Sequence, residues 1–150
     1  MNNADKIFHY KLVMIIDDSK IDRFLVELNI KKYDFAEEII SKESAKSALQ
    51  YLALSADSPE KLPELIFLDI RMPEIDGFGF LGEYEKLPDS VKKNCIVMML
   101  SSSLDPEDLD RAEKNKYVKR FVNKPINGQK LQDILDDITL RSPLHFINID

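Results

Sequence analysis

Three aspartates and one lysine are the residues of this chain best suited to carry out chemistry, because each stands at the end of a short apolar run. Asp17 and Asp18 follow the run 12–16, Asp69 follows the run 65–68, and Lys124 follows the run 121–123. Short apolar runs bounded by polar residues are typical of strands buried on both faces, as in parallel sheets. In an open parallel sheet the carboxyl ends lie at one edge, where ligands bind. The four side chains are therefore expected to converge.

Such a cluster of acids is unfavourable without a partner. Two like charges about 4 Å apart repel by roughly 4 kcal/mol at an effective dielectric constant near 20. A divalent cation would remove that repulsion and create a place for a phosphate group. The pattern therefore predicts metal-assisted phosphoryl chemistry.

Composition limits the class of protein. A chain of 150 residues with 44% hydrophobic and 32% charged residues is typical of one soluble domain with a single core. A net charge of −6, with no basic stripe, argues against direct binding of nucleic acid. The single cysteine, Cys95, begins an apolar run and is expected to be a buried thiol. Because no apolar stretch reaches the roughly 18 residues of a membrane span, and residues 1–10 lack a signal-peptide core, the chain is expected to be cytoplasmic.

Strand and helix patterns alternate five times along the chain. Strands are expected at 11–16, 38–41, 65–68, 95–100 and 119–122, and helices at 19–32, at 44–54, from residue 77 to before 88, at 105–115 and at 127–140. The first helix has one apolar face at i, i+3, i+4 and i+7, formed by Ile21, Phe24, Leu25 and Leu28. The buried stripe expected in the last helix is Leu131, Ile134, Leu135 and Ile138. This alternation predicts an α/β fold with right-handed crossovers and helices on both faces of the sheet.

The chain resembles the receiver domain of two-component response regulators over about residues 11–140. The matching segments are Ile16-Asp17-Asp18-Ser19, the run from Asp69 to Gly77, Met99-Leu100-Ser101-Ser102 and Asn123-Lys124-Pro125. Each segment alone is weak evidence, but together they occur in order, each at the end of its own strand. The resemblance implies a flavodoxin-like (βα)5 doubly wound sandwich with a five-stranded parallel sheet of order 2-1-3-4-5. It also implies a receiver domain at 11–141, an N-terminal extension at 1–10, a C-terminal tail at 142–150 and no effector domain.

The resemblance further implies a metal-dependent phosphoacceptor. Asp69 would be the nucleophile that attacks the phosphorus of a phosphohistidine or a small acyl phosphate. The family's cofactor is Mg²⁺, which suits carboxylate, carbonyl and water oxygens. Asp18 and Asp69 would bind the metal directly, Asp17 would bind it through a water, and Arg71 would bind it through its backbone carbonyl.

Four further residues receive roles from the same resemblance. Lys124 would pair with a phosphoryl oxygen, and Ser101 would donate its hydroxyl to the attached phosphoryl group. Phe121 occupies the aromatic switch position, for which a plain core phenylalanine is the alternative. Ser103 and Arg71 flank the approach of the hydrolytic water, and because neither is suited to orient a water, slow self-dephosphorylation is expected.

The implied partners are a sensor histidine kinase or a phosphotransfer protein, with no nucleic acid and no membrane. The chain would be a signalling phosphoacceptor, not an enzyme acting on other substrates, although it would catalyse its own phosphorylation and dephosphorylation. Its signal would leave by protein–protein interaction or by onward phosphotransfer. The output face would be built from 105–115, 119–122 and 127–140, and a homodimer through this face is one form of output.

Other classes fit the sequence less well. A phosphatase of the haloacid dehalogenase type needs an acid two positions after its nucleophile, but Ser19 stands two after Asp17. A flavodoxin-like flavin carrier needs a phosphate-binding loop where Asp17 and Asp18 would repel phosphate. A pseudo-receiver, with the fold but without phosphotransfer, is the serious alternative, and the presence of all the acidic and basic residues disfavours it. Asp17 as a helix N-cap is a simpler alternative, which the matching positions of Asp18 and Asp69 disfavour. Asp76 is expected to shape the turn before Gly77 and not to contact phosphate.

Overall fold

A computed structural model describes residues 7–102 and 105–137 of the chain. In this part, five parallel strands form one sheet of order β2-β1-β3-β4-β5, as predicted. The strands are β1 (Tyr10–Ile16), β2 (Ala36–Lys42), β3 (Leu65–Asp69), β4 (Ile96–Ser101) and β5 (Val118–Asn123). Every predicted strand is present, and no strand end differs from its predicted position by more than two residues.

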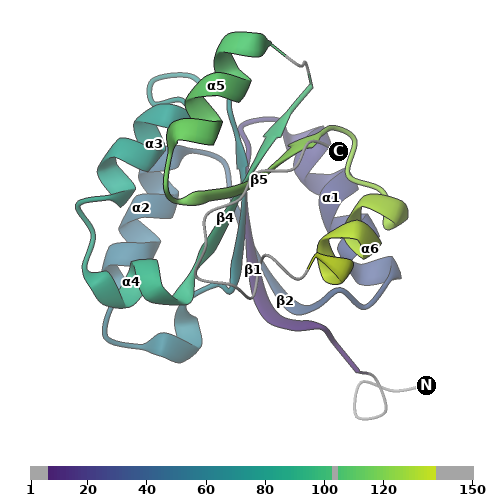
Figure 1. Cartoon of the computed structure of the whole chain (residues 1–150). Helices are drawn as coiled ribbons and strands as arrows, with labels where there is room; N and C mark the ends of the chain where they lie inside the picture. The colour runs from purple at the N-terminus through teal and green to yellow at the C-terminus, as the bar shows by residue number, and fades with distance from the viewer. Residues whose placement is uncertain (1–6, 103–104, 138–150) are drawn as a thin grey trace.

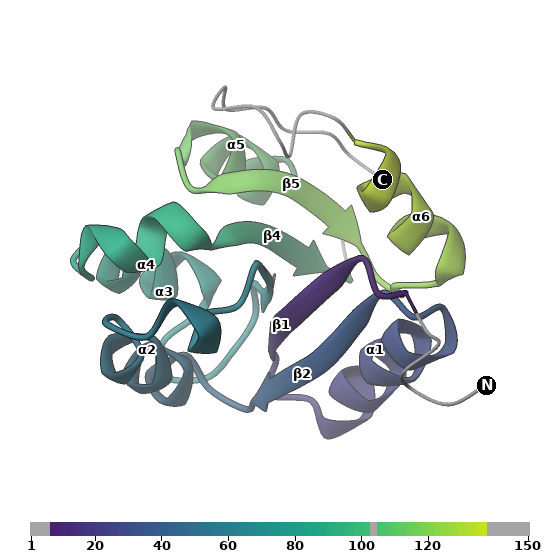
Figure 2. The same ribbon diagram turned by 90° about the horizontal axis from the view of Figure 1, so that it is seen from below.

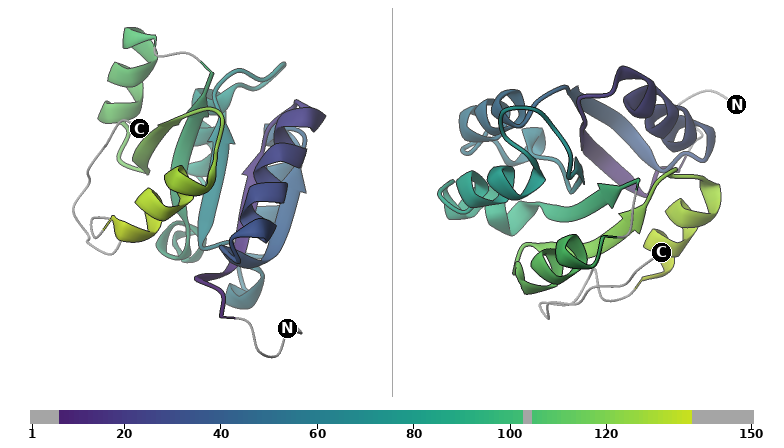
Figure 3. Two further views of the ribbon diagram at one scale, coloured as in Figure 1. Left: turned by 90° about the vertical axis from the view of Figure 1, so that its right-hand side faces the viewer. Right: turned by 90° about the horizontal axis from the view of Figure 1, so that it is seen from above.

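Helices cover both faces of the sheet. They are α1 (Lys20–Lys32), α2 (Ala45–Leu54), α3 (Gly77–Tyr84), α4 (Asp89–Asn94), α5 (Pro106–Lys114) and α6 (Gly128–Asp136), with a short 3₁₀ turn at Pro59–Lys61. Figure 1 shows α2, α3, α4 and α5 on one side of the sheet and α1 and α6 on the other. The same layers are seen from below in Figure 2, and in the left view of Figure 3 α1 and α6 lie in front of the sheet. The chain is therefore a doubly wound α/β sandwich.

The sheet separates two hydrophobic clusters. Met14, Ile66 and Met99 face the cluster under α2, α3, α4 and α5, whereas Val13 and Phe67 face the cluster under α1 and α6. All five residues of β3 are buried, because the sheet is covered on both faces.

The prediction for the apolar face of α1 is corrected by the structure. The four residues of that face are exposed: Ile21 by 71%, Phe24 by 60%, Leu25 by 42% and Leu28 by 51%. The sheet instead buries Val26 and Ile30, which lie one turn apart on the opposite side of the helix. The helix has two apolar faces, and periodicity does not tell which one the sheet covers.

The region between α3 and β4 also differs from the prediction. Pro88 was expected to help end the preceding helix, but α3 ends at Tyr84 and Pro88 is the N-cap of the additional helix α4. Val91 anchors this short helix in the core with 0% exposure. Cys95 is buried, as predicted, and burial raises the pKa of its thiol to about 12.

Parts of the predicted chain organisation lie outside the described residues. These parts are the end of the last predicted helix with Ile138, the tail at 142–150 and most of the N-terminal extension. Among the described helices, none is both long enough and apolar enough to cross a membrane.

Candidate functional site

The register of the sheet places the predicted residues at one edge. Ile16 lies opposite Leu68 in the pairing of β1 with β3, so the residues that follow these two positions, Asp17 and Asp69, lie at the same level. Asp69 in turn lies opposite Leu100, one residue before Ser101. The residues that end these strands therefore meet at the carboxyl edge, as the sequence predicted.

Lys124 is the centre of the polar network at this edge. Its Nζ lies 2.7 Å from Asp17 Oδ2, 2.9 Å from Asp22 Oδ2 and 3.0 Å from Asp69 Oδ1. Burial lowers the pKa of Lys124, but hydrogen bonds to Asp17 and Asp22 outweigh that effect, so its pKa lies above the ordinary value. The ammonium group therefore stays charged at neutral pH.

Asp69 is 5% exposed, and its carboxyl lies near the charges of Asp17, Asp18 and Lys124. Burial first, and then the negative charge of Asp17, raise the pKa of Asp69 from 3.8 to about 6, although Lys124 acts in the opposite direction. A carboxyl with this pKa is mostly ionised at neutral pH, as a nucleophile must be.

Asp17 is almost fully buried, at 1% exposure. Its Oδ1 accepts a hydrogen bond from the backbone N–H of Ser19 at 2.9 Å, while its backbone oxygen accepts one from Arg23 Nη1 at 2.7 Å. The N-cap of α1 is Ser19, whose hydroxyl accepts from the N–H of Asp22. Asp17 is therefore not the helix cap, and one of its carboxylate oxygens points to Lys124.

The donor set of this edge fits a hard divalent cation. Asp17, Asp18 and Asp69 each offer a carboxylate oxygen, and these atoms lie within 4.8 Å of one another. Two of the three acids are buried, and Asp18 is exposed. Oxygen ligands of this kind suit Mg²⁺.

The predicted switch residues are both buried. Ser101 ends β4 with 2% exposure, and its backbone oxygen accepts from the N–H of Lys124 at 2.7 Å. Phe121 is 0% exposed and lies opposite Met99 in the sheet, within the cluster that also contains Ala112 of α5. Ser103, predicted to tune phosphoryl lifetime, lies outside the described residues.

The turn between Asp69 and α3 contains two features that shape the site. Asp76 caps α3, because its Oδ1 accepts from the N–H of Gly79 at 2.8 Å, which agrees with its predicted turn role. A Cβ on Gly77 would lie only 2.7 Å from the backbone oxygen of Asp69 and 2.9 Å from the Cα of Ile70. Glycine therefore allows α3 to start directly against the acceptor strand.

Two acids of this region were not predicted from the sequence. Asp22 binds Lys124 from the first turn of α1. Asp108 of α5 is 3% exposed and forms an ion pair with the guanidinium of Arg71, which also lies 3.7 Å from Asp105. The position of Asp22 three residues after Ser19 is a weak signal in the sequence, whereas nothing local indicates that Arg71 and Asp108 meet.

The family profile described as the response regulator receiver domain matches residues 13–136. The chain belongs to the response regulator receiver family. The matched range contains the whole described sheet from Val13 onward and every residue of the acidic edge. The receiver resemblance found in the sequence is thereby confirmed.

Similar proteins extend this assignment. A two-component response regulator from Cytophaga hutchinsonii has a solved structure with a TM-score of 0.78 and 32% identity, over 85% of this chain and 95% of that one. Response regulator Rcp1 from Synechocystis sp. is 30% identical, over 85% of this chain and 86% of its own. The receiver domain of histidine kinase CKI1 from Arabidopsis thaliana, in its complex with Mg²⁺, has a TM-score of 0.73 and 26% identity, over 85% and 91% of the chains. Two other curated relatives are longer than the matched region. The chain spans 80% of the length of one and 52% of the length of the other.

Proposed function

We propose that this receiver is a phosphoacceptor in a cytoplasmic two-component phosphorelay, with Asp69 as the residue that becomes phosphorylated. An Asp69 carboxylate oxygen would attack the phosphorus of a phosphohistidine. The P–O bond forms as the P–N bond breaks, and the departing electron pair stays on the imidazole nitrogen. The observation that carries this proposal is the position of Asp69, ionised at neutral pH, 3.0 Å from the Lys124 ammonium and beside the acids Asp17 and Asp18.

The acids at this edge would hold Mg²⁺. Asp18 and Asp69 would bind directly, Asp17 through a water and Arg71 through its backbone carbonyl. When bound, the cation supplies neutralisation of the charge that develops on the phosphoryl oxygens. The fit of the oxygen donor set supports this assignment, as does the Mg²⁺ complex of the CKI1 receiver.

Lys124 and Ser101 would receive the phosphoryl group. Lys124 is already oriented toward Asp69, and its ammonium can pair with a phosphoryl oxygen with little reorganisation. The Ser101 hydroxyl, at the end of the neighbouring strand, would donate to another oxygen. Phosphoryl transfer needs chiefly positioning and charge neutralisation, and these residues provide both.

Acetyl phosphate with Mg²⁺ tests the acceptor directly. Intact-mass analysis of the wild type should show one added phosphoryl group, and Asp69→Asn should show none. Asp57→Asn, which removes an exposed loop carboxylate, is the matched control and should be modified like the wild type. Equal modification of Asp69→Asn and the wild type would refute the acceptor assignment and favour a pseudo-receiver.

The phosphodonor would dock on the exposed apolar face of α1, formed by Ile21, Phe24, Leu25 and Leu28. Exposed contiguous apolar side chains commonly mark protein–protein contacts. This face borders the acceptor site, because Asp22 of the same helix binds Lys124 and Leu25 lines a small cavity of about 50 Å³ with Lys124 and Pro125. Four side chains supply far less than the roughly 800 Å² per partner of a standard stable interface, so the face suits a transient signalling contact.

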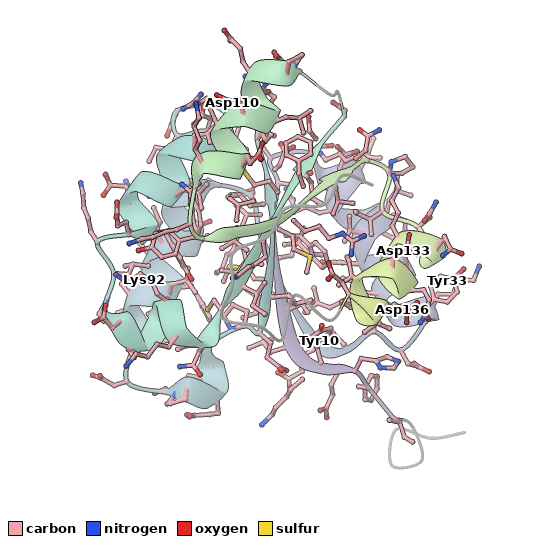
Figure 4. The ribbon with its side chains drawn as sticks, viewed as in Figure 1. Tyr10, Tyr33, Lys92, Asp110, Asp133 and Asp136 are labelled. Carbon is pink, nitrogen blue, oxygen red and sulfur yellow. The ribbon has the colours of Figure 1, made fainter. Side chains whose placement is uncertain are left out.

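Comparing two donors separates docking from chemistry. Phe24→Gln should slow phosphotransfer from a phosphorylated histidine phosphotransfer domain but leave modification by acetyl phosphate unchanged. Tyr33→Gln is the control, because Tyr33 is also exposed but follows the C-terminal end of α1 (Figure 4). An equal rate from the protein donor for both variants would exclude the α1 face as the docking surface.

The output would leave through the surface of α5, β5 and α6, by partner binding, by homodimer formation or by onward phosphotransfer. Movement of Ser101 toward the phosphoryl group, with repacking of Phe121, would reshape this surface as a population shift. Beryllofluoride, a phosphoryl mimic, should then perturb amide NMR signals across α5, β5 and α6. Shifts confined to the neighbours of Asp69 would favour a shuttle or phosphate-sink role.

A further inference from the structure

The attachment of α5 to the rest of the domain is partly polar. Of its residues, only Asp108 and Ala112 are buried, so one of its two buried side chains is a carboxylate. Among the described residues, the ion-pair partner of Asp108 is Arg71, which lies in the turn after β3. Leu109 packs against the core from this end of the helix, and Arg71 is the cation that holds Asp108 beside it.

The two partners in this ion pair differ in their freedom to move. The Asp108 side chain is 5% exposed, whereas that of Arg71 is 61% exposed. Arg71 is thus able to rotate into solvent or toward another anion, while Asp108 would be left buried and unpaired. A buried carboxylate without a partner is strongly unfavourable, so loss of Arg71 would displace the first turn of α5.

A second contact holds α5 at a different point. The guanidinium of Arg111 lies 3.9 Å from the centre of the Phe78 ring on α3. This cation–π contact is one turn further along α5 than Asp108. Release of Asp108 would therefore let the first turn move while the helix stays fastened to α3.

Phosphorylation would place a competing anion close to Arg71. Arg71 follows Asp69 by two residues, so their Cα atoms are at most about 7.6 Å apart. A phosphoryl group carries a charge of about −1.5 to −2 at neutral pH. Mg²⁺ would neutralise part of this charge, whereas Lys124 is already shared by Asp17, Asp22 and Asp69. A planar guanidinium matches phosphoryl oxygens in geometry and would add a second protein cation beside Lys124.

We propose that Arg71 is a second phosphoryl-binding cation of this receiver, held by Asp108 before phosphorylation and transferred to the phosphoryl group afterwards. This inference rests on the proposed function, because it needs Asp69 as the acceptor. The exchange couples the site to α5, since Arg71 cannot serve both anions fully. It assigns to the Arg71 side chain a role distinct from its backbone carbonyl.

Beryllofluoride affinity in saturating Mg²⁺ tests this exchange, because two variants should change it in opposite directions. Asp108→Asn removes the nearer of the two carboxylates beside Arg71 and should tighten binding about fivefold, the factor that corresponds to about 1 kcal/mol of ion-pair energy. Arg71→Gln removes the cation and should weaken binding by a similar factor. Asp110→Asn removes the same charge from an exposed position of α5 (Figure 4) and should leave the affinity unchanged.

A purely structural ion pair would behave differently. Both Asp108→Asn and Arg71→Gln would then loosen α5 and change the affinity in the same direction or not at all, which would overturn the proposal. Hydrogen exchange gives a second measurement: beryllofluoride should raise amide exchange at Glu107 and Leu109 of the wild type, whose N–H groups bond to Asp105. Unchanged exchange there would also overturn it. Failure of the proposed function is recognised separately, because the wild type would then neither bind beryllofluoride nor be modified at Asp69 by acetyl phosphate.

Discussion

Replacing Asp69 by asparagine should stabilise the folded protein in the absence of divalent cations, although it removes an ion pair. Burial and the charge of Asp17 raise the pKa of Asp69 from 3.8 to about 6 in the folded state, and this value already includes the attraction of Lys124. The folded state therefore binds a proton at Asp69 more tightly than the unfolded state. As a result, the stability contributed by this carboxyl falls as the pH rises from about 3.8 to about 6 and is constant above that.

The size of the effect follows from the same values. One pKa unit corresponds to about 1.4 kcal/mol, so ionised Asp69 lowers the free energy of unfolding by up to about 3 kcal/mol above pH 6. Asparagine carries no charge and avoids this loss. Lys124 keeps its contacts with Asp17 and Asp22 in the variant, so it is not left unpaired.

Urea unfolding followed by circular dichroism, in buffers with a chelator, measures this difference. At about pH 7.5, Asp69→Asn should be more stable than the wild type by up to about 3 kcal/mol, and the gain should shrink as the pH falls below about 6. Asp57→Asn, at an exposed loop position, should show no such gain. Saturating Mg²⁺ should narrow the difference, because the cation stabilises the wild-type carboxylate. A variant no more stable than the wild type at neutral pH, or a gain that does not depend on pH, would refute the reasoning.

Three further perturbations test other parts of the structure. Asp18→Asn should weaken Mg²⁺ binding in a metal titration, because it removes an anionic ligand, and unchanged affinity would contradict the metal site. Ile30→Ala should lower the free energy of unfolding by about 2–5 kcal/mol, whereas Phe24→Ala should change it by less than about 0.5 kcal/mol, because only Ile30 is buried. Gly77→Ala should cost about 1–3 kcal/mol and slow phosphorylation by acetyl phosphate, since the new Cβ would lie 2.7 Å from the backbone oxygen of Asp69. Wild-type stability and rate for this variant would show that α3 can shift without disturbing the acceptor.

The sheet and the acidic edge could be predicted from the sequence because both are encoded locally. Runs such as 65–68 are apolar without alternation, which is typical of strands covered on both faces. Parallel strands place their carboxyl ends at one edge, so residues such as Asp17, Asp69 and Lys124 must meet there once the strands are neighbours. Buried Cys95 and the turn role of Asp76 were likewise predictable from their local context.

Other features depended on which surfaces come together. The spacing of residues such as Phe24 predicted one apolar face on α1, but packing against the sheet buries Val26 and Ile30 and leaves Phe24 exposed. The short helix α4 was missed because its single buried residue, Val91, gives no periodic pattern. In each case the outcome is set by contacts between elements and not by the local preference of one element.

For the charges of the site, the sequence predicts the location and the tertiary structure sets the pairing. That acids and a lysine lie at one edge follows from the sequence, but their pairing depends on side-chain directions across distant elements. Asp22 joins Lys124 over 102 residues, and Arg71 meets Asp108 over 37 residues. The raised pKa of Asp69 likewise follows from burial, which no sequence pattern measures. The sequence by itself thus determined the succession of strands and helices along the chain and the chemistry at the strand ends, because these are properties of local patterns, whereas the strand order within the sheet came from the family resemblance. Only the tertiary structure decided which charges are paired, because electrostatic energy depends on distance and burial.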